Sequence, residues 1–582
     1  MPVRHVGVAD APGGAIFRAM NQADTPAVDP WLERFLRAYY DRRPVNATFV
    51  GVHEHDHRFA DLSAAGVDDT VSEMRSLLEE ADTGRKAPDA PLAGIDRRLA
   101  EGFLRIQGWE YSSGHFLGNP SIHVGEAVFG LMALLLPDST PSEDRLHALR
   151  ARMAALPDFL AQSRLHLHEV PTPWTLRAIR ECKGGLAFLR GGVSHVDSRL
   201  QKVAEPAAAA LEDFGAFLES TVLRRPKAEA GCGPEAFGLY LREGHFLTQS
   251  ADEIVRYARD EMAKADSEMS RGADEFGAEN AADAIATLAD RRPDVTRYYR
   301  RYQEIWDAMR QLSDDRALLT WPDFPIRYVP RPQWARASAP DLYFLFYRSP
   351  AAFGRPAIHD YLVTPIDDSM SAEERETLLR ADNDGVIKLN HVVHHGGIGH
   401  HVQNWHAFRS PLRIGRIAAV DCASRIAMFC GATMAEGWAC YATDLMAEVG
   451  GLTPLERFAL RHARVRMCAR AIVDVELHNG RMTLDDAAAF YQERAGMTAA
   501  GAEAEAVKNS MFPASALIYL MGTDMIHELR ADLCRAPEDD LTLGSFHDAF
   551  LSYGSIPVRL IGNEMRRRAA LGLPLGAHEA SS

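Results

Sequence analysis

The stretch HVVHHGGIGHH, residues 391–401, places five histidines close together, and His406 follows them in VQNWH. Imidazole nitrogens bind zinc and other divalent transition metals, and they also exchange protons near neutral pH. Any one of these histidines is as often a structural residue as a ligand, but five of them with three glycines are more typical of a site. The segment therefore indicates metal binding or proton chemistry. The alternative is that it is the remnant of a site that once did both.

Helical spacing decides which of these histidines can meet. Residues three or four apart share a helical face, so His391 can share an ion with His394 or His395. His394 and His400 do not share a face, whereas His394 and His401 share one but lie about 10.5 Å apart along the axis. Only a break in the helix brings either pair onto one metal. Three glycines permit such a break: Gly396, Gly397 and Gly399.

A second polar segment invites the same question. GVHEHDHRFADLS contains His53, Glu54, His55, Asp56 and His57. Strict alternation of these residue types gives no common helical face. We therefore interpret the segment as a polar stretch that lines a cleft, with a second metal site as the less favoured alternative.

The composition is that of a folded, acidic protein. Of the 582 residues, 47% are hydrophobic and 25% are charged, and the formal net charge is -16. Nucleic acid and anionic membrane surfaces are not expected as partners, because both require a concentrated basic face. The expected partner is a small-molecule or peptide-like substrate, and the oligomeric state stays open.

The cysteines and the N-terminal residues indicate the cellular compartment. The seven cysteines are scattered without a CxxC pair, so reduced thiols are expected. The start, MPVRHVGVADAPGGA, lacks the basic beginning and apolar core of a signal peptide, and the longest apolar run, at 127–136, is too short to span a membrane. The sequence thus predicts a cytoplasmic protein.

Helix signals dominate the rest of the chain. Three capping boxes predict helix starts, at Ser250 with Glu253, Thr453 with Glu456, and Thr483 with Asp486. Five prolines between residues 320 and 340 are too many for a regular helix or a central strand and mark a change of organisation, and PAIHDYLVTPID alternates like a short strand. We expect a mainly α protein with a flexible lead-in (1–30), an N-terminal helical half (31–315), a Pro-rich insert with a small antiparallel β element (316–370) and a C-terminal helical half (371–582).

Four segments of the C-terminal half occur in an order that resembles a known family. They are HHGGIGHH at 394–401, AEGWACY at 435–441, AIVDVELHNG at 471–480 and PASALIYLMG at 513–522. They resemble HExxPGHH, EGWA.Y, VD.G.H and P.QA..Y..G of the domain-of-unknown-function family DUF885, which is related to zinc metallopeptidases of the gluzincin type. The N-terminal half is similar to the same family at 44–63 and 235–262, so the resemblance spans roughly residues 31 to 570.

The resemblance implies a large, helical, zincin-like body with its cleft between the two helical halves. It also implies that His394, His400 and Glu436 hold Zn²⁺ or another divalent transition metal, since two histidines and one glutamate leave such a site an open position. His401 is expected as a fourth ligand, as a residue that supports a ligand, or as a core histidine. His478 and Tyr519 match donors that gluzincins direct at a developing oxyanion.

Several positions depart from the family pattern. His395 stands where the family has its catalytic glutamate, and Ile398 replaces the proline. Ser515 replaces the glutamine of the last segment, and Lys508 and Asn509 stand where an arginine and a tyrosine are expected. Imidazole can accept a proton as a carboxylate would, so His395 is a candidate base, a further ligand or a residue without a role.

The sequence therefore predicts a zinc-dependent, hydrolase-like enzyme with altered chemistry. Its reaction is expected to be hydrolysis, or another reaction such as elimination or cyclisation. One alternative is a catalytically inactive pseudo-peptidase that binds a ligand or a protein partner in the old cleft. Another is a metal-binding or sensing protein.

Overall fold

The structure is a computed structural model, and it describes residues 29–83, 91–136, 141–342, 349–354, 358–367, 369–420, 425–534 and 541–577. The predicted lead-in therefore lies almost entirely outside the described residues, as does Cys422. The other six cysteines are free thiols. None of the helices in these ranges combines the length and the apolar character that a membrane crossing requires.

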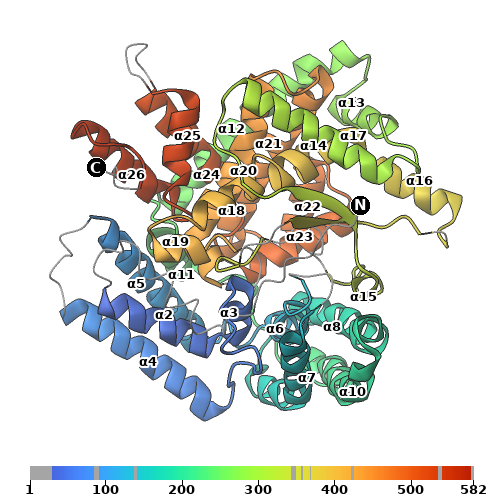
Figure 1. Ribbon diagram of the computed structural model, residues 1–582, viewed down its shortest axis with the longest axis vertical. Helices are drawn as coiled ribbons and strands as arrows, with labels where there is room; N and C mark the ends of the chain where they lie inside the picture. The colour runs from blue at the N-terminus through green and yellow to red at the C-terminus, as the bar shows by residue number, and fades with distance from the viewer. Residues whose placement is uncertain are drawn as a thin grey trace, which may run out of the picture.

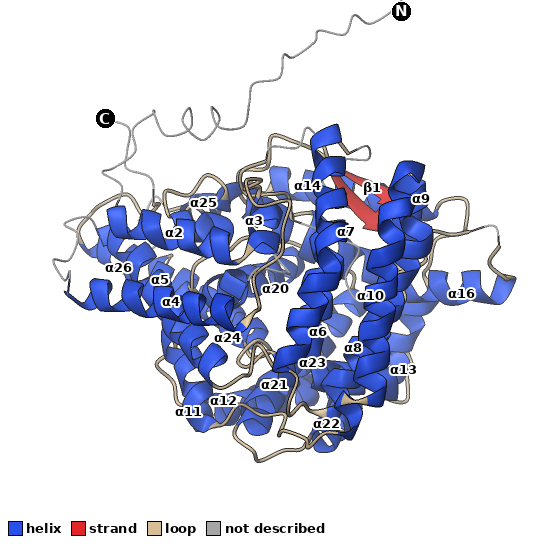
Figure 2. Cartoon of the chain, turned by 90° about the horizontal axis from the view of Figure 1, so that it is seen from below, coloured by secondary structure: helices blue, strands red, loops and turns tan. Residues whose placement is uncertain are grey.

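The chain is mainly α-helical, as its sequence predicts (Figures 1 and 2). The helices before the insert are α2 (Pro30–Arg42), α3 (Pro44–Val50), α4 (Ala64–Thr83), α5 (Pro91–Ser112), α6 (Pro120–Met132), α7 (Glu143–Ser163), α8 (Thr172–Ala187), α9 (Val193–Val196), α10 (Gln201–Ser220), α11 (Pro234–Leu239), α12 (Ala251–Gly272), α13 (Ala281–Ala286) and α14 (Tyr298–Asp315). The α-helices from the insert onward are α15 (Gln333–Arg336), α16 (Ala372–Ala381), α17 (Asp384–Val386), α18 (His400–Ala407), α19 (Arg413–Ile417), α20 (Ala432–Glu448), α21 (Pro454–His478), α22 (Leu484–Ala495), α23 (Ala499–Met511), α24 (Ile518–Leu533), α25 (Leu543–Leu551) and α26 (Val558–Ala570).

All three predicted capping boxes are present, at the starts of α12, α21 and α22. In each box the first side chain accepts the backbone N–H three residues on, and the acidic side chain accepts the N–H of the first residue. A fourth box, Ser371 with Glu374, opens α16. Local sequence therefore specifies these helix starts before any tertiary contact is made.

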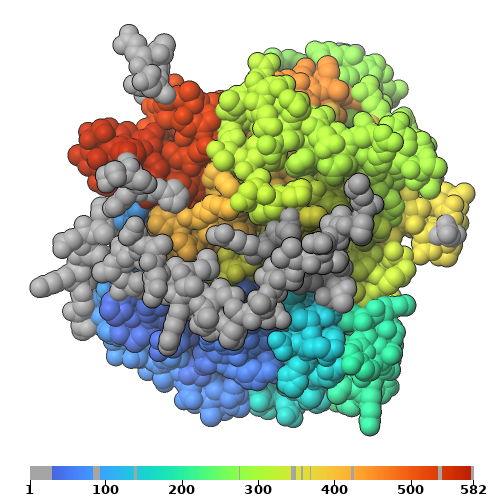
Figure 3. All heavy atoms as spheres, viewed as in Figure 1, coloured from blue at the N-terminus to red at the C-terminus, as the bar shows by residue number. Residues whose placement is uncertain are grey.

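Helices from both sides of the insert share one large apolar core. Its members include Phe35 of α2, Phe103 of α5, Met262 of α12, Trp438 of α20, Ile472 of α21 and Ile526 of α24. The helices α6, α7, α8 and α10 surround a second core and run side by side in both views (Figures 1 and 2). The space-filling view has the first helices and the last helices on the same side of the molecule (Figure 3).

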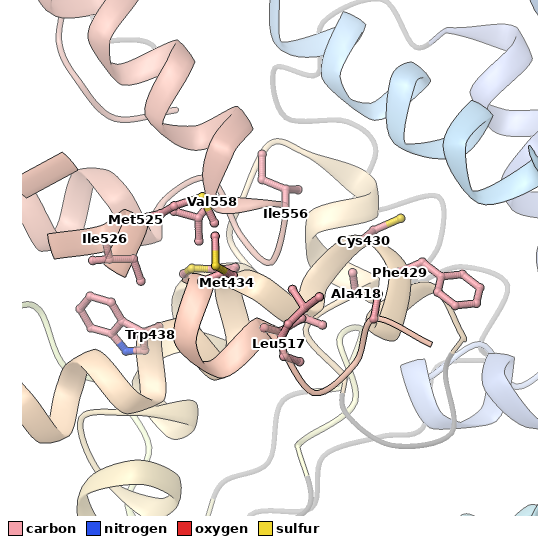
Figure 4. Packing of buried hydrophobic residues seen from close by; sticks show 14 of the residues in the cluster. Ala418, Phe429, Cys430, Met434, Trp438, Leu517, Met525, Ile526, Ile556 and Val558 are labelled. Carbon is pink, nitrogen blue, oxygen red and sulfur yellow. The ribbon is translucent and has the colours of Figure 1, made fainter. Parts of the chain in front are cut away.

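Close contact between α20 and α24 depends on two glycines. A Cβ at Gly437 would overlap the backbone of Gly522, and a Cβ at Gly522 would overlap the carbonyl of Thr433. Around this contact, Met434 and Trp438 of α20 lie near Met525 and Ile526 of α24 (Figure 4). The contact fixes α20, which carries Glu436, relative to α24, which carries Tyr519.

The insert forms a two-stranded sheet, and its strands are parallel rather than antiparallel as predicted. β1 (Ile326–Pro330) pairs with β2 (His359–Val363), with Ile326 opposite His359 and Pro330 opposite Val363. An antiparallel pair needs only a tight turn, whereas a parallel pair needs a long crossover. Residues 331–358 supply that crossover, which strand-forming residues alone do not reveal.

The sheet supports the segment that carries the histidines. Its inner face joins Tyr298 and Tyr302 of α14 in a third apolar cluster with Ile387 and Val392. The Tyr361 hydroxyl of β2 lies 2.7 Å from Nδ1 of His391. The insert therefore packs against the histidine segment and stabilises its position.

Candidate metal centre

The histidine segment is a π-helix that ends in a sharp break. The π-helix η8 covers Ile387–Gly396, and α18 begins at His400. Extra residues in a helical turn, as in a π-helix, occur often at functional sites because they redirect side chains. A Cβ at Gly399 would overlap the carbonyl oxygen of His394, so only glycine lets the chain fold back this closely.

Two tryptophans hold the break in place. The indole N–H of Trp306 donates to the carbonyl of Gly396, and that of Trp438 donates to the carbonyl of Ile398, both at 2.9 Å. These bonds satisfy two carbonyls that a broken helix leaves without intrahelical partners. The loop between η8 and α18 is thus fixed from two sides.

The break brings three histidines together. The ring centroids of His394 and His400 lie 5.0 Å apart, and His395 lies 4.6 Å from His394 and 5.4 Å from His400. One nitrogen from each of the three rings lies within 4.8 Å of the others. The pair that helical spacing separates, His394 and His400, therefore meets through the glycines.

Glu436 of α20 faces this cluster. Its Oε2 lies 3.4 Å from Nε2 of His394 and 3.9 Å from Nε2 of His400. The same Oε2 is buried, and no hydrogen-bond donor within the described ranges reaches it. Burial raises the pKa of Glu436, but His394, His400 and Lys508 outweigh burial and hold that pKa at about 2. The carboxylate is therefore ionised and directed at two imidazoles.

The neighbours of His395 and His400 orient their rings. His395 Nδ1 lies 2.7 Å from the carbonyl oxygen of Asn390, which only accepts, so Nδ1 carries the proton and Nε2 keeps its lone pair. His400 Nδ1 lies 3.3 Å from Oε1 of Gln403, and the amide of Gln403 donates to the Ser555 hydroxyl. Such hydrogen bonds on one ring nitrogen prepare the other for a metal.

His395 stays neutral at physiological pH. Burial lowers the pKa of its imidazole well below the usual 6.5, and the neighbouring His394 and His400 lower it further. A neutral imidazole can bind a metal or accept a proton through its unprotonated nitrogen. Both roles predicted for this position remain compatible with its geometry.

The cluster opens into a cavity of about 430 Å³ between the two parts of the chain. One wall comes from α6 and α8, with Ser121, Ile122, Gly125, Glu126, Phe129, Arg177 and Glu181. The opposite wall comes from α20, α23, α24 and the residues just before α20, with Arg425, Met428, Ala432, Ala435, Glu436, Lys508, Met511, Ile518 and Tyr519. His395 and His400 also line the cavity, so its contents can reach the histidine cluster.

The charged groups of the cavity include both signs. Arg177 pairs with Glu181 at 2.8 Å, and Glu181 also accepts the hydroxyl of Ser121. Burial raises the pKa of Glu126 to about 7 although Arg152, Arg43 and Arg425 oppose that rise. The cavity therefore suits a polar substrate rather than a purely apolar one.

His401 lies outside the cluster. Its ring lies edge-on to Phe324 at 5.1 Å and stacks on His359 at 5.8 Å between centroids. Burial lowers its pKa to about 3. His401 therefore does not contribute to the group of ligand atoms, although the sequence made it a candidate ligand.

His478 is part of the interior and does not line the cavity. Its Nε2 donates to the carbonyl of Asn509 at 3.0 Å, and its Nδ1 accepts the N–H of Cys232 at 3.2 Å. Burial lowers its pKa to about 4. Because both ring nitrogens are engaged, the structure gives His478 a structural role in place of the predicted oxyanion contact.

Tyr519 lines the cavity. The guanidinium of Arg470 lies 4.5 Å from its ring centroid. The turn before α24 is held by Asp474, whose carboxylate accepts the N–H groups of Ala514, Ala516 and Leu517 at 2.8 to 3.0 Å. Asp474 therefore positions the start of α24 and, through it, Tyr519.

The HEHDH segment forms a turn away from the cavity wall. His53 Nδ1 lies 2.8 Å from Asp56 Oδ2, and the Arg58 guanidinium donates to His55 Nδ1 at 3.2 Å. Among the residues that the structure describes, no three His, Asp or Glu side chains of this segment bring their ligand atoms within reach of one ion. The segment does not form a second site of this kind.

Sequence reasoning did not identify the charged residues that the N-terminal half contributes to the cavity. Glu126, Arg177 and Glu181 lie in helices without any motif. Arg425 had a usable signal: residues 425, 428, 432, 435 and 436 recur at helical spacing before and within the AEGWACY segment. The positions of Glu126, Arg177 and Glu181 in the cavity wall depend on the packing of helices that are distant in sequence.

Comparisons with protein families and solved structures give matches over most of the chain. A family model described as a bacterial protein of unknown function (DUF885) matches residues 44–565. No curated protein matches the chain. The chain is similar to the structure of "a putative lipoprotein of unknown function from Shewanella oneidensis", with 20% identity, a TM-score of 0.69, and coverage of 92% of this chain and 99% of that one.

A second solved structure, "the putative lipoprotein from Colwellia psychrerythraea", is 17% identical with a TM-score of 0.72. The match covers 92% of this chain and 97% of that one. At these identities the likeness establishes the fold alone. Both neighbours therefore support a shared helical architecture over nearly the full length.

Proposed function

This chain belongs to the bacterial family of unknown function DUF885, and we propose that it is a metal-dependent enzyme acting on a small polar or peptide-like substrate. The observation that carries the proposal is the buried Oε2 of Glu436, which has no hydrogen-bond donor in the described ranges and faces two imidazole nitrogens at 3.4 and 3.9 Å. A buried ionised carboxylate is unfavourable without a compensating cation.

The donor set suits zinc. Tetrahedral zinc with bonds of about 2.0–2.1 Å keeps its ligand atoms about 3.3 Å apart, close to the separations around Glu436. We propose His394, His400 and Glu436 as the ligands of Zn²⁺ or another divalent transition metal, as in zinc peptidases of the gluzincin type. When bound, the ion would supply Lewis-acid polarisation of a substrate oxygen.

His395 accepts the proton that the reaction releases. Its Nδ1–H is held by the carbonyl of Asn390, so its Nε2 is the acceptor, and its ring lies beside both proposed histidine ligands. A low pKa makes this imidazole a weaker base than the family's glutamate. Because His395 is neutral and the family's glutamate is an anion, the centre of this protein carries one negative charge fewer.

Lys508 and Tyr519 complete the reacting region. Both line the cavity, and the charge of Lys508 acts on Glu436. An ammonium and a hydroxyl at the edge of such a centre stabilise negative charge that develops on a substrate oxygen. They take the role that the resemblance gave to His478 and Tyr519.

The reaction that fits these groups is hydrolysis of an amide or ester, or a proton transfer that leads to elimination or cyclisation. Each needs an acceptor for one proton and a stabilised oxyanion, which His395 and the Lys508–Tyr519 pair provide. Gain of peptidase activity in His395→Glu would select hydrolysis. Turnover that stops in His395→Glu and continues in His395→Gln would exclude His395 as the base.

Metal content tests the proposal directly. Protein expressed with ample zinc should contain one ion per chain, and His394→Ala and Glu436→Ala should lose it, as measured by plasma mass spectrometry. His147→Gln, an exposed histidine of α7, serves as the matched control and should keep the ion. If wild-type protein contains no metal, the proposal is wrong, and the alternative is a non-catalytic protein that binds a ligand or a partner in the cavity.

The location of the protein is a separate prediction. The sequence favours the cytoplasm, whereas the two solved neighbours are described as lipoproteins. Fractionation of cells that make the full native protein distinguishes the two. Recovery in the soluble cytoplasmic fraction supports the prediction, and recovery with membranes until detergent is added contradicts it.

A further inference from the structure

Arg425 lies in the cavity wall, away from the histidine cluster. The residue is 6% exposed, and it precedes the π-helix η9 (Ala427–Gly431) that leads into α20. Three phenylalanine rings surround its guanidinium, with centroids 4.8 to 5.6 Å away: Phe116, Phe429 and Phe512. A cation in such surroundings interacts strongly with any anion that reaches it, because little water screens it.

A fully buried acid fixes this guanidinium. Glu110 of α5 accepts Nη2 of Arg425 and the hydroxyl of Tyr240, and its other oxygen accepts the amide of Gln107. Gln107 in turn accepts from Arg43. The acceptor oxygens of Glu110 are thus engaged, and the arginine side chain is held in one orientation.

The described residues do not engage every donor of Arg425 with a strong acceptor. Arginine offers five N–H donors in a planar fork; Glu110 accepts from Nη2, and Nη1 has only the thioether sulfur of Met428, a weak acceptor, at 3.6 Å. Nε is buried and has no hydrogen-bond acceptor within the described ranges. An arginine of this kind in a cavity wall is prepared for a planar anion such as a carboxylate.

Among the residues that the structure describes, the other charged groups of the cavity wall do not pair with Arg425. The other arginine in the walls, Arg177, is already paired with Glu181 at 2.8 Å. Glu126 also lines the cavity, and burial raises its pKa to about 7, which lowers the negative charge facing an incoming anion. An anionic substrate group is therefore attracted to the Arg425 end of the cavity.

The helix gives the distance between this end and the proposed centre. Residues 425, 428, 432, 435 and 436 line the cavity from one continuous helical face. From residue 425 to residue 436 the axis rises by roughly 15 Å. An extended peptide covers about 3.5 Å per residue, so about four residues bridge this distance.

We propose that Arg425 binds a free carboxylate of the substrate, and that the substrate is an elongated, peptide-like acid whose reacting bond lies about four residues from that carboxylate. This inference rests on the proposed function for the identity of the reacting end. It adds the chemical class of the substrate and the direction in which the substrate lies in the cavity. The carboxylate lies at Arg425, and the scissile or otherwise reacting group lies at His395 and Glu436.

Binding of matched probes tests the inference. Alanine peptides of two to five residues, each as the free acid and as the C-terminal amide, are titrated calorimetrically into zinc-loaded wild-type protein. The free acid of the best length should bind about tenfold to hundredfold more tightly than its amide, because it alone makes charge-assisted hydrogen bonds. Equal affinities, or no binding of either form at millimolar concentration, would overturn the inference.

Two variants attribute the preference to Arg425. Removing Arg425 alone leaves Glu110 as a buried unpaired charge, so the double variant Glu110→Gln with Arg425→Met removes both charges together. In it the ratio of acid to amide affinity should fall to about one. Arg425→Lys, which keeps the charge without the fork, should retain part of the ratio.

The matched control is an exposed pair outside the cavity. Glu212→Gln with Arg190→Met removes an exposed ion pair and should leave the wild-type ratio unchanged. A preference that persists in the folded Glu110→Gln, Arg425→Met protein would contradict the inference. If that protein does not fold, the wild-type comparison of acid with amide still decides.

Metal content measured on the same preparations separates the two proposals. Zinc-loaded protein without a preference for the acid contradicts the carboxylate inference and leaves the proposed metal enzyme standing. A preference for the acid in protein that contains no metal contradicts the proposed enzyme and leaves Arg425 as a carboxylate-binding residue.

Discussion

Two parts of the molecule use hydrogen-bonded histidine in opposite ways. At the break between η8 and α18, His395 and His400 each have Nδ1 near an oxygen acceptor, and both rings belong to the cluster with His394. At the end of α21, His478 has both nitrogens engaged by backbone groups. The His547 ring is similarly engaged by Leu318 and Tyr441.

The comparison shows that burial and a lowered pKa do not distinguish a histidine of the cluster from a structural histidine. The pKa of His395 and that of His478 are both lowered by burial. What differs is the surroundings of the ring: His395 lies beside two further imidazoles, whereas both nitrogens of His478 are bonded to backbone groups. An imidazole in a cluster beside an ionised carboxylate is suited to a metal site, and one bonded to the backbone through both nitrogens stabilises the fold.

The largest expected difference between the regions is the response to zinc. Zinc at about 100 times its dissociation constant should raise the unfolding free energy of wild-type protein by about 2.7 kcal/mol. His400→Ala should abolish this gain, because loss of a ligand weakens binding by more than about 100-fold. Urea titrations with and without zinc measure it.

His478→Ala is the matched variant in the other region, and it should keep the full zinc response. A zinc response that disappears in His478→Ala but survives in His400→Ala would reverse the assignment of the two regions.

The second difference concerns stability without metal. His478→Ala should lower the unfolding free energy by about 3 kcal/mol, since it opens a cavity and leaves the Cys232 N–H and the Asn509 carbonyl without their partner. Exposed His147→Gln should change it by less than about 0.5 kcal/mol. Urea denaturation of metal-free proteins measures both. A loss below about 1 kcal/mol in His478→Ala would argue against the engaged ring.

The third difference is a pH dependence. The pKa of His478 is about 4 in the folded chain and near 6.5 when exposed, so between these values the unfolded state binds the extra proton. Stability from this residue is complete above pH 6.5 and is lost as the pH falls toward 4. The slope should reach about 1.4 kcal/mol per pH unit.

His478→Asn should therefore flatten the acid limb of the stability curve by one proton, measured by urea denaturation from pH 4.5 to 7. His147→Gln should leave the slope as it is. An unchanged slope in His478→Asn would mean that the folded ring takes up protons as freely as the unfolded one.

The smallest effect expected is that of the residue behind a ligand. Gln403→Leu removes the acceptor for His400 Nδ1 and should weaken zinc binding about tenfold. Gln403→Glu keeps an acceptor oxygen and should retain most of the affinity. Competition with a fluorescent zinc chelator measures both. Equal affinities in the Leu and Glu variants would show that Gln403 does not orient the ring.

Sequence patterns predicted the parts of the molecule that local chemistry determines. The capping boxes at Ser250, Thr453 and Thr483 begin helices as expected, because side chain and backbone within one turn satisfy each other. The strand in PAIHDYLVTPID is present as β2. Its parallel pairing was not predictable, since it depends on where residues 331–358 carry the chain.

The candidate site divides in the same way. The glycines marked the break that joins His394 and His400, because few other residues tolerate so close a return of the backbone. The surroundings of His401 and His478 depend on Phe324, Cys232 and Asn509, which are distant in sequence. Family motifs identify such positions without revealing which ring nitrogens the fold has already engaged.

The indole hydrogen bonds at the break have an optical consequence. Trp306 and Trp438 donate to the carbonyls of Gly396 and Ile398, on either side of the turn that sets the distance between His394 and His400. Indole emission depends on the partner of its N–H group. These two among the eight tryptophans of the chain therefore act as built-in fluorescent reporters of any movement in that turn when the cavity is filled.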